Sequence, residues 1–303
     1  MATLKQLVDE TSNIKNELID CHTDLKNNLI NKGVEVTNND KMSNLIDKIN
    51  DISSVFEEVA VKLRLFHTDS NRGTLYELDV NTLQPIKTVS SPSIHPGGIG
   101  GGFDGNKLRL FHTDSNTDKL YELDINTLQP IKTVNSPGAI PYGIGGGFDG
   151  NKLRLFHVDS KIKKLYELDV NTLQPIKTVN SLGTVPHGIG GGFDGNKLRL
   201  FHTDSNIGKL YELDVNTLQP IKTVNSPGTV PHGIGGGFDG NKLILFHVDS
   251  FIEKLYELDV NTLQPIKTVK PPGTVPDAIG GGHYTINKKY VMHNGIKYEL
   301  KEV

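Results

Sequence analysis

Short runs of alternating hydrophobic and polar residues cover most of the chain, and the pattern repeats every 45 residues. Within one repeat, for example residues 143–179, four such runs read GIGGGF, KLRLFHV, KLYELDV and QPIKTV, and turn signals separate them. A period of two is typical of half-buried strands, and no window between the runs has the spacing of a helix. Four strands per repeat predict the blade of a β-propeller.

The order of the four strands within a blade follows from their glycines and prolines. The glycine-rich run suits the inner strand, where neighbouring backbones crowd the axis, and Pro175 in the fourth run is tolerated only on an outer edge. An inner turn at Asp149-Gly150-Asn151 joins the first two strands. A middle turn and an outer turn follow, and a connecting loop leads to the next blade. We therefore expect the strands to run from axis to rim.

The number of blades depends on how the two ends of the repeat region are assigned. Complete copies are marked by a repeated phenylalanine, at Phe66, Phe111, Phe156, Phe201 and Phe246. Residues 55–60 lie one period before the next inner strand, and AIGGGHYT after Val269 offers a further inner strand followed by two more strand signals. We therefore predict an all-β propeller of six four-stranded blades over residues 53–303, the last without its outer strand. A five-bladed ring is the alternative, but it would leave the last two strands unpaired.

Residues 1–52 have a helical pattern instead. Apolar or small residues recur at alternating spacings of three and four, which is the seam of a coiled coil. The seam consists of Leu4, Leu7, Thr11, Ile14, Leu18, Cys21 and Leu25. We predict a helix that ends at Gly33 and assembles copies of the chain, with an amphipathic helix packed on the propeller as the alternative. Met42, Leu45, Ile46 and Ile49 form a second apolar stripe.

Composition and charge limit the classes of function. The net charge is -3, and 32 basic and 35 acidic residues are spread along the chain, so no basic stripe offers a surface for nucleic acid or anionic lipid. The first residues lack an apolar signal core and no run of 18 apolar residues occurs, so we expect neither secretion nor membrane insertion but synthesis in the cytoplasm. The lone Cys21 excludes an internal disulfide and an all-cysteine metal site.

No catalytic arrangement, cofactor site or metal site is predicted from the motifs. GIGGGF has the glycines of a phosphate loop, but a strand follows it, so no helix N-terminus is available for an anion. A His-x-Asp-Ser motif occurs in every copy, whereas an active site normally distinguishes one blade from the rest. Its histidines are His67, His112, His157, His202 and His247. We assign them to hydrogen bonds that brace the middle turn.

Arginines recur in the second strand, two residues before the repeated phenylalanine. They are Arg64, Arg109, Arg154 and Arg199, and the fifth copy has Ile244 instead. A buried arginine needs an acidic partner, and a glutamate of the third strand, such as Glu122, is available. We predict structural ion pairs that join neighbouring blades.

Differences between the copies cluster at two places. The middle turns carry Asn71, Arg72, Asn116, Asp118, Lys161, Asn206 and Phe251. The residues where the connecting loop reaches the inner strand are Gly97, Tyr142, His187, His232 and Asp277. In a zigzag blade these two places lie at one face, which makes this changing face the candidate binding surface. Aromatic and imidazole rings beside Asn and Asp suit sugars, because rings stack on sugars and the polar side chains form hydrogen bonds with them. The alternative explanation of the differences between copies is neutral drift of exposed turns.

Two segments resemble known families. The string VPHGIGGGFDGNKLRLFHTDSNIGKLYELD resembles NHL and related propeller repeats, which implies an architecture but no particular function. Residues 25–49, LKNNLINKGVEVTNNDKMSNLIDKI, are similar to a segment near the start of tail-fibre and tail-associated proteins of phages that infect Gram-positive bacteria. This second resemblance implies a virion or phage-tail-like particle, with trimeric fibres attached to other tail or baseplate proteins.

Our hypothesis is a trimeric receptor-binding protein of the tail-fibre kind, in which propeller loops bind a bacterial cell-surface glycan. Several shallow sites on each propeller would raise avidity without a single tight site. The second hypothesis is a free-standing lectin, similar to five-bladed GlcNAc-binding propellers. The third is a hydrolase resembling six-bladed lactonases, which hold a metal in the axial channel; it is disfavoured because Asp277 is the only acidic residue at the axial position.

Overall fold

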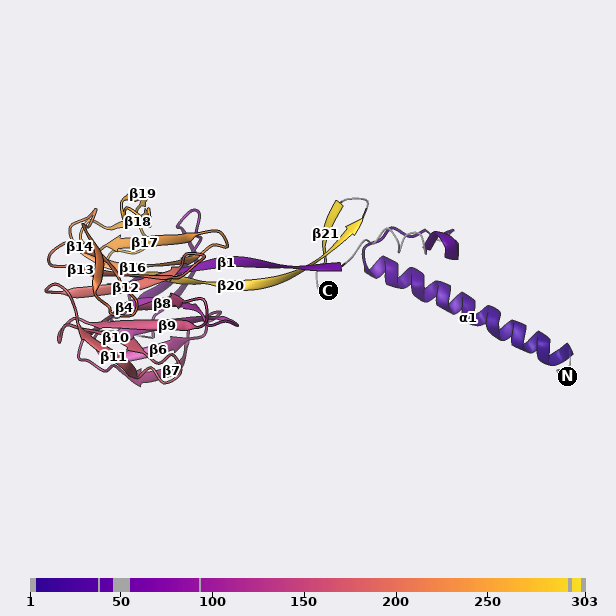
Figure 1. The fold of residues 1–303 in the computed structure, drawn as a ribbon, viewed down its shortest axis with the longest axis horizontal. Helices are drawn as coiled ribbons and strands as arrows, with labels where there is room; N and C mark the ends of the chain where they lie inside the picture. The colour runs from indigo at the N-terminus through magenta and orange to yellow at the C-terminus, as the bar shows by residue number, and fades with distance from the viewer. Residues whose placement is uncertain (1–3, 38, 46–54, 93, 294–295, 301–303) are drawn as a thin grey trace. The chain divides into compact units, whose positions relative to one another are not determined.

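The computed structural model describes residues 4–37, 39–45, 55–92, 94–293 and 296–300 (Figure 1). The chain divides into two compact units, one formed by residues 1–60 with 287–303 and the other by residues 61–286. The first unit contains the helix α1 (Leu4–Asn31) and the second contains the blades. Among the described residues, no helix has both the length and the hydrophobicity to cross a bilayer.

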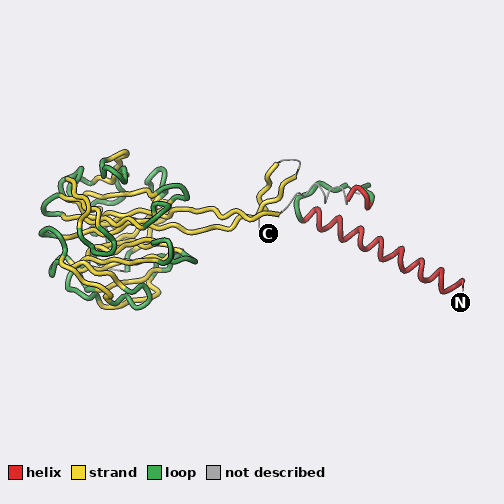
Figure 2. Tube along the Cα trace, in the orientation of Figure 1, coloured by secondary structure: helices red, strands yellow, loops and turns green. Residues whose placement is uncertain are grey.

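Antiparallel strands form the second unit, and loops join them (Figure 2). Blade 2 contains β4 (Pro96–Phe103), β5 (Leu108–Asp114), β6 (Lys119–Leu123) and β7 (Pro130–Asn135). Blade 3 contains β8 (Pro141–Phe148), β9 (Leu153–Asp159), β10 (Lys164–Leu168) and β11 (Pro175–Asn180). Blade 4 contains β12 (Pro186–Phe193), β13 (Leu198–Asp204), β14 (Lys209–Leu213) and β15 (Pro220–Asn225). Blade 5 contains β16 (Pro231–Phe238), β17 (Leu243–Asp249), β18 (Lys254–Leu258) and β19 (Pro265–Val269).

Both ends of the repeat region contribute to blade 1, so the ring has five blades and the prediction of six is wrong. The sheet order is β21-β20-β1-β2-β3, with β20 (Pro276–His293) as the inner strand beside β1 (Val55–Asp69). The remaining strands are β2 (Thr74–Leu78), β3 (Pro85–Ser90) and β21 (Ile296–Leu300). The final strand signals are not left unpaired, because β20 continues beyond the inner-strand position and pairs with β21.

The glycines decide which segment lies at the axis. A Cβ on Gly146 would lie 1.9 Å from the carbonyl oxygen of Arg154, and one on Gly280 would lie 2.4 Å from the carbonyl oxygen of Ile99. Such contacts exclude any side chain, so only a glycine-rich segment can pass there. Residues 55–60 lack these glycines and belong to the second strand of blade 1. The predicted order of strands from axis to rim is confirmed.

The hydrophobic core lies between neighbouring blades. Phe111 and Leu120 of blade 2 pack in one cluster with Leu155 and Tyr166 of blade 3, and Phe111 is fully buried. The same cluster recurs around the ring. Each blade therefore completes its core against the next one, and the fold depends on closure of the ring.

A Schellman motif ends α1, as the sequence predicts. Gly33 has φ 76°, its N–H donates to the carbonyl of Ile30, and the N–H of Val34 donates to the carbonyl of Leu29. Leu29, Val34 and Leu45 then form a small buried cluster. Ile46 and Ile49 of the predicted second stripe lie outside the described residues.

Candidate functional site

The repeated histidines are structural. His112 Nδ1 lies 2.8 Å from the carbonyl oxygen of Gly98 in its own inner strand, and Nε2 lies 3.2 Å from Ser91 Oγ in the connecting loop. The ring is fully buried, and desolvation lowers the pKa of His112 to about 4. His157, His202 and His247 have the same environment and the same lowered pKa. These histidines are neutral braces that join the second strand to the inner strand and the connecting loop.

The aspartate of the same motif holds the middle turn. Asp204 Oδ1 accepts hydrogen bonds from the backbone N–H groups of Asn206 and Ile207, each at 3.0 Å. Its Oδ2 accepts one from Val185 in the connecting loop at 2.9 Å. The two regions that change between copies are thus fixed to each other by a constant, fully buried carboxylate.

The predicted residues at the axial opening come together on four neighbouring inner strands. The ring of Tyr142 stacks on that of His187 with centroids 4.2 Å apart, and His187 stacks on His232 at 3.7 Å. His232 Nδ1 lies 2.8 Å from Asp277 Oδ1, and His187 Nε2 lies 3.6 Å from the same oxygen. Gly97 occupies the fifth position and contributes no side chain. We call Tyr142, His187, His232 and Asp277 the axial cluster.

Burial is the largest single influence on the pKa values of His187, Asp277 and Tyr142 in the axial cluster. Desolvation lowers the pKa of His187 to about 3, so this imidazole is neutral at physiological pH. Burial acts to raise the pKa of Asp277, but the hydrogen bond from His232 and the nearby His187 outweigh it and hold the pKa below its usual value. Burial, and then the charge of Asp277, raise the pKa of Tyr142. A buried carboxylate therefore stays ionised beside imidazoles.

The candidate residues of the middle turns do not converge. Each blade contributes its own turn, on which Asn71, Arg72, Asn116, Lys161, Asn206 and Phe251 are exposed and Asp118 is half-buried. Two of the asparagines join the middle turn to the connecting loop, because Asn71 Nδ2 donates to Thr274 Oγ1 at 3.1 Å and Asn206 Nδ2 donates to Thr184 Oγ1 at 2.8 Å. These residues form separate positions and not one pocket.

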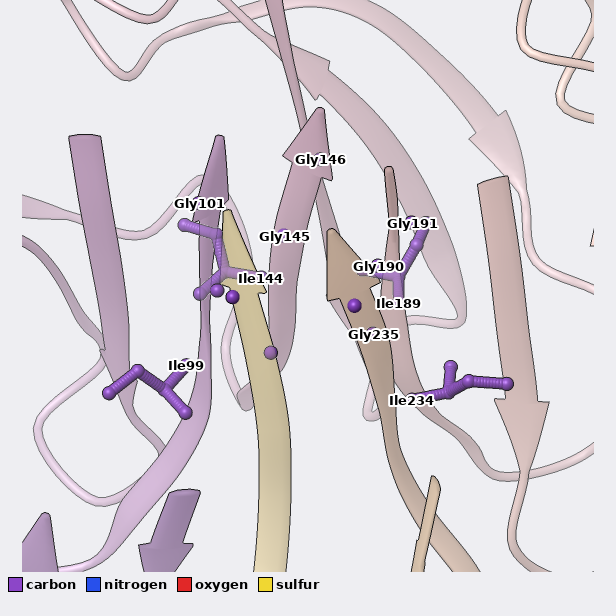
Figure 3. Close-up of a pocket in the computed structure, with 14 residues that line it drawn as sticks. Ile99, Gly101, Ile144, Gly145, Gly146, Ile189, Gly190, Gly191, Ile234 and Gly235 are labelled. Carbon is purple, nitrogen blue, oxygen red and sulfur yellow. The ribbon is translucent and has the colours of Figure 1, made fainter. Parts of the chain in front are cut away.

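The interior of the ring is closed. Isoleucines and glycines of all five inner strands surround the axis (Figure 3), and the gaps between them total about 140 Å³, none of which is wide enough for a water molecule. At the end of the inner strands away from the axial cluster, five rings contact one another. They belong to Phe103, Phe148, Phe193, Phe238 and His283. The axis therefore offers no channel between the axial cluster and the other end of the inner strands.

Grooves between neighbouring blades open at the other face, where the inner and outer turns lie. The groove between blades 3 and 4 has about 810 Å³ of open space and is lined by Asp149, Arg154, Lys197, Asn216 and Ile221, among others. The groove between blades 2 and 3 has about 830 Å³ and is lined by the residues 45 positions earlier. We call these sites the inter-blade grooves. A third, between blades 1 and 2, has about 650 Å³.

Arg154 forms one wall of an inter-blade groove. Its Nε and Nη2 donate to the two carboxylate oxygens of Glu167 at 2.8 and 2.9 Å, and Nη2 and Nη1 reach the carbonyl of Val215 and Asn216 Oδ1 in the next blade. The ion pair therefore lies within a blade, and the prediction of pairing across blades is wrong. Glu167 lies directly opposite Phe156 in the neighbouring strand. Phe156 is two residues from Arg154, so Arg154 and Glu167 lie on the same face of the sheet as diagonal neighbours.

The two grooves on either side of blade 3 combine polar groups with an exposed apolar side chain. Lys197 and Asn216 are exposed, and Ile221 in the outer strand is 62% exposed. The equivalent isoleucine is exposed by 60 to 64% in every blade: Ile86, Ile131, Ile176, Ile221 and Ile266. An apolar wall beside hydrogen-bond donors and acceptors fits a sugar, which has one apolar face and a polar edge.

Sequence reasoning missed the grooves because it looked for function only where the copies differ. The residues that line the grooves on either side of blade 3 are identical at equivalent positions, and several belong to the words GNKL and NTLQPIKTV. The repeated isoleucine in the outer strand was the feature of the sequence that pointed to the grooves. Stability of the fold does not require an apolar residue at a solvent-exposed position.

No family model matches the sequence, and no curated protein matches it. Solved structures resemble it only at low identity. Glutaminyl cyclase of Myxococcus xanthus is 12% identical, with 80% of this chain and 95% of that chain covered and a TM-score of 0.48. A functionally unknown protein of Desulfotomaculum acetoxidans is 13% identical, with 78% of both chains covered and a TM-score of 0.43. Similarities this distant support no argument about function.

Proposed function

We propose that this chain is a receptor-binding protein of a phage tail or phage-tail-like particle, and that its propeller binds a bacterial cell-surface glycan at several equivalent sites. The observation that carries the proposal is the recurrence of one inter-blade groove with the same residues. Such sites bind the same ligand with the same affinity, which is what attachment to a repetitive polymer requires. Weak contacts then multiply through effective concentration.

The inter-blade grooves suit this role better than the middle turns. Lys161 and Phe251 occupy equivalent places in the middle turns of two blades but have unlike chemistry, so no single sugar would fit both. In the grooves, Lys152 and Lys197 are equivalent and identical, as are Asn171 and Asn216. The proposal therefore places the glycan at the constant face and leaves the changing face for other contacts.

Attachment to a particle is supported by the N-terminal sequence, whose residues 25–49 resemble tail-fibre proteins, and by the open apolar seam of α1. Ile14 and Leu18 are 57% and 58% exposed, and a groove of about 940 Å³ beside them is lined by Thr11, Ile19 and Met42. Copies of the same helix would cover this surface in a trimer, and the particle's tail or baseplate would hold the fibre. A free-standing lectin remains the second candidate, and it requires no such assembly.

The test is binding of the labelled full chain to Gram-positive cells and to purified cell-wall polysaccharides. The double substitution Ile176→Ser and Ile221→Ser removes the apolar walls of two grooves and is expected to weaken binding at least about tenfold, because avidity is a product over sites. Both side chains are exposed, so stability should not change.

The matched control is Ile162→Ser with Ile207→Ser, which changes two exposed isoleucines of the middle turns. This control should bind as the wild type does. The reverse pattern would move the binding site to the changing face, and absence of binding to every cell-wall glycan would contradict the proposal.

A further inference from the structure

The axial cluster differs from the rest of the repeat. The residue before it is proline in all five copies, and the residues after it are Gly-Ile, or Ala-Ile in the last copy. Between these constant neighbours the chain has Gly97, Tyr142, His187, His232 and Asp277. At this changing position, three side chains with metal-binding atoms meet.

Two distances describe this meeting point. Asp277 Oδ1 lies 2.8 Å from His232 Nδ1 and 3.6 Å from His187 Nε2, and the ligand atoms of the three residues all lie within 4.8 Å of one another. Ligand atoms around a tetrahedral zinc ion are about 3.3 Å apart, given the usual bond lengths. We propose that His187, His232 and Asp277 bind one divalent transition-metal ion of the zinc class.

The donor atoms and the buried charge both fit such an ion. Two imidazole nitrogens with one carboxylate oxygen are ligands of zinc and similar ions, whereas calcium and magnesium prefer oxygen alone. Asp277 is only 4% exposed, and a buried carboxylate is costly unless a positive charge lies beside it. A divalent cation bound by Asp277 provides that charge.

Binding requires a local rearrangement. The rings of His187 and His232 are stacked 19° from parallel, so their in-plane lone pairs do not point at one position. His232 must turn about its Cβ–Cγ bond and release its hydrogen bond to Asp277. It is the more exposed of the two, with 19% of its side chain accessible against 7% for His187, and therefore has room to turn. Metal and proton compete for this site.

Gly97 leaves one sector of the opening without a side chain, between the strands that carry Asp277 and Tyr142. Three protein ligands also leave the fourth position of a tetrahedral ion free. The bound ion would therefore hold water, or an oxygen atom of a ligand that enters from this face. This inference is independent of the proposed glycan binding, because the inter-blade grooves lie at the other face.

The experiment uses the untagged full chain, stripped of metal with EDTA and titrated with Co²⁺. We expect one Co²⁺ per chain, a visible absorption spectrum of tetrahedral nitrogen and oxygen coordination, and displacement by Zn²⁺. His187→Phe keeps a ring in the stack but removes a ligand. It should weaken Co²⁺ binding at least about 100-fold, since even the loss of a residue that only orients a ligand costs 10- to 100-fold.

His283→Phe is the matched control. It removes a buried histidine at the other end of the axis and restores the phenylalanine found in the other copies, so Co²⁺ binding should not change. If His187→Phe has the circular dichroism spectrum of the wild type and binds Co²⁺ as tightly, the proposal is wrong. It is equally wrong if the wild-type chain takes up no Co²⁺ at large excess, whatever the variants do.

Discussion

Individual arginines connect the blades to one another. Arg154 binds Glu167 in its own blade and two oxygens of the next blade, and its guanidinium lies 5.4 Å from the centroid of the Phe156 ring. Arg109 and Arg199 make the equivalent contacts. In blade 5, Ile244 replaces the arginine and Glu257 is half-buried, whereas Glu167 is buried. The side chain of the glutamate thus becomes more accessible where the arginine is absent.

Arg154→Ile copies the residue of blade 5 into blade 3. We expect the free energy of unfolding to fall by about 3 kcal/mol, because Glu167, with 11% of its side chain exposed, loses its guanidinium partner. Urea unfolding of the full chain measures this change. The double variant Arg154→Ile with Glu167→Leu should recover most of the loss. Equal instability of the single and double variants would show that the ion pair is not the cause.

Helix α1 is an element with two different halves. Its C-terminal part is covered, because Leu29 is buried against Val34 and Leu45 and Leu25 packs beside them. Farther toward the N-terminus, Ile14, Leu18 and Cys21 of the predicted seam are exposed. Leu4 and Leu7 lie in the helix, but their side chains are not described. An apolar stripe open to solvent over several turns is the surface that the proposed coiled coil would cover.

Mass measurement by light scattering tests whether the seam assembles the chain. We expect the full chain to have three times the mass of one copy, which is 33.2 kDa. Ile14→Lys with Leu18→Lys places charges in the seam and should give monomers, because like charges would be buried together. Ile30→Lys, at an exposed position outside the seam, should remain trimeric. A monomeric wild type would rule out the coiled coil and favour the free-standing lectin.

At the scale of the whole molecule, the ring is held by the same contacts five times. Lys87 Nζ donates to the carbonyl of Asn126 in the next blade, and Lys267 makes the same contact to Asn81, which joins blade 5 to blade 1. The contact from the histidine Nδ1 to the inner strand also repeats in every blade. His67 Nδ1 lies 2.8 Å from the carbonyl oxygen of Ala278, so the brace also connects the two ends of the repeat region.

The repeated histidines predict that acid destabilises the propeller. The pKa of His112, His157, His202 and His247 is lowered to about 4, below the value of 6.5 for an unfolded histidine. The unfolded chain then binds more protons between these values, so stability is constant above pH 6.5 and falls as the pH drops toward 4. At pH 5 each histidine costs about 2 kcal/mol.

Urea unfolding between pH 8 and pH 5 measures this dependence. His157→Gln keeps an N–H donor for the carbonyl of Gly143 but cannot take up a proton, so its stability should fall less steeply with pH than that of the wild type. An unchanged slope in this variant would show that the repeated histidines do not control acid stability.

The sequence alone determined the local structure. The period of two placed the strands, the glycines and Pro175 ordered them from axis to rim, and Gly33 ended the helix. The His-x-Asp motif was correctly assigned to hydrogen bonds, although the aspartate, and not the histidine, holds the middle turn. These features depend on residues close together in the chain or on steric limits at a single position. The sequence pattern is therefore sufficient to predict them.

Only the tertiary structure decided how distant segments meet. Five blades close because β20 and β1, more than 200 residues apart, become neighbours, and no local pattern encodes the angle between blades that sets this number. The same closure places Asp277 beside His232. The inter-blade grooves likewise exist only where two neighbouring sheets pack against each other. Within one repeat their residues have the pattern of structural residues, and they form the walls of a site only when the next blade is in place.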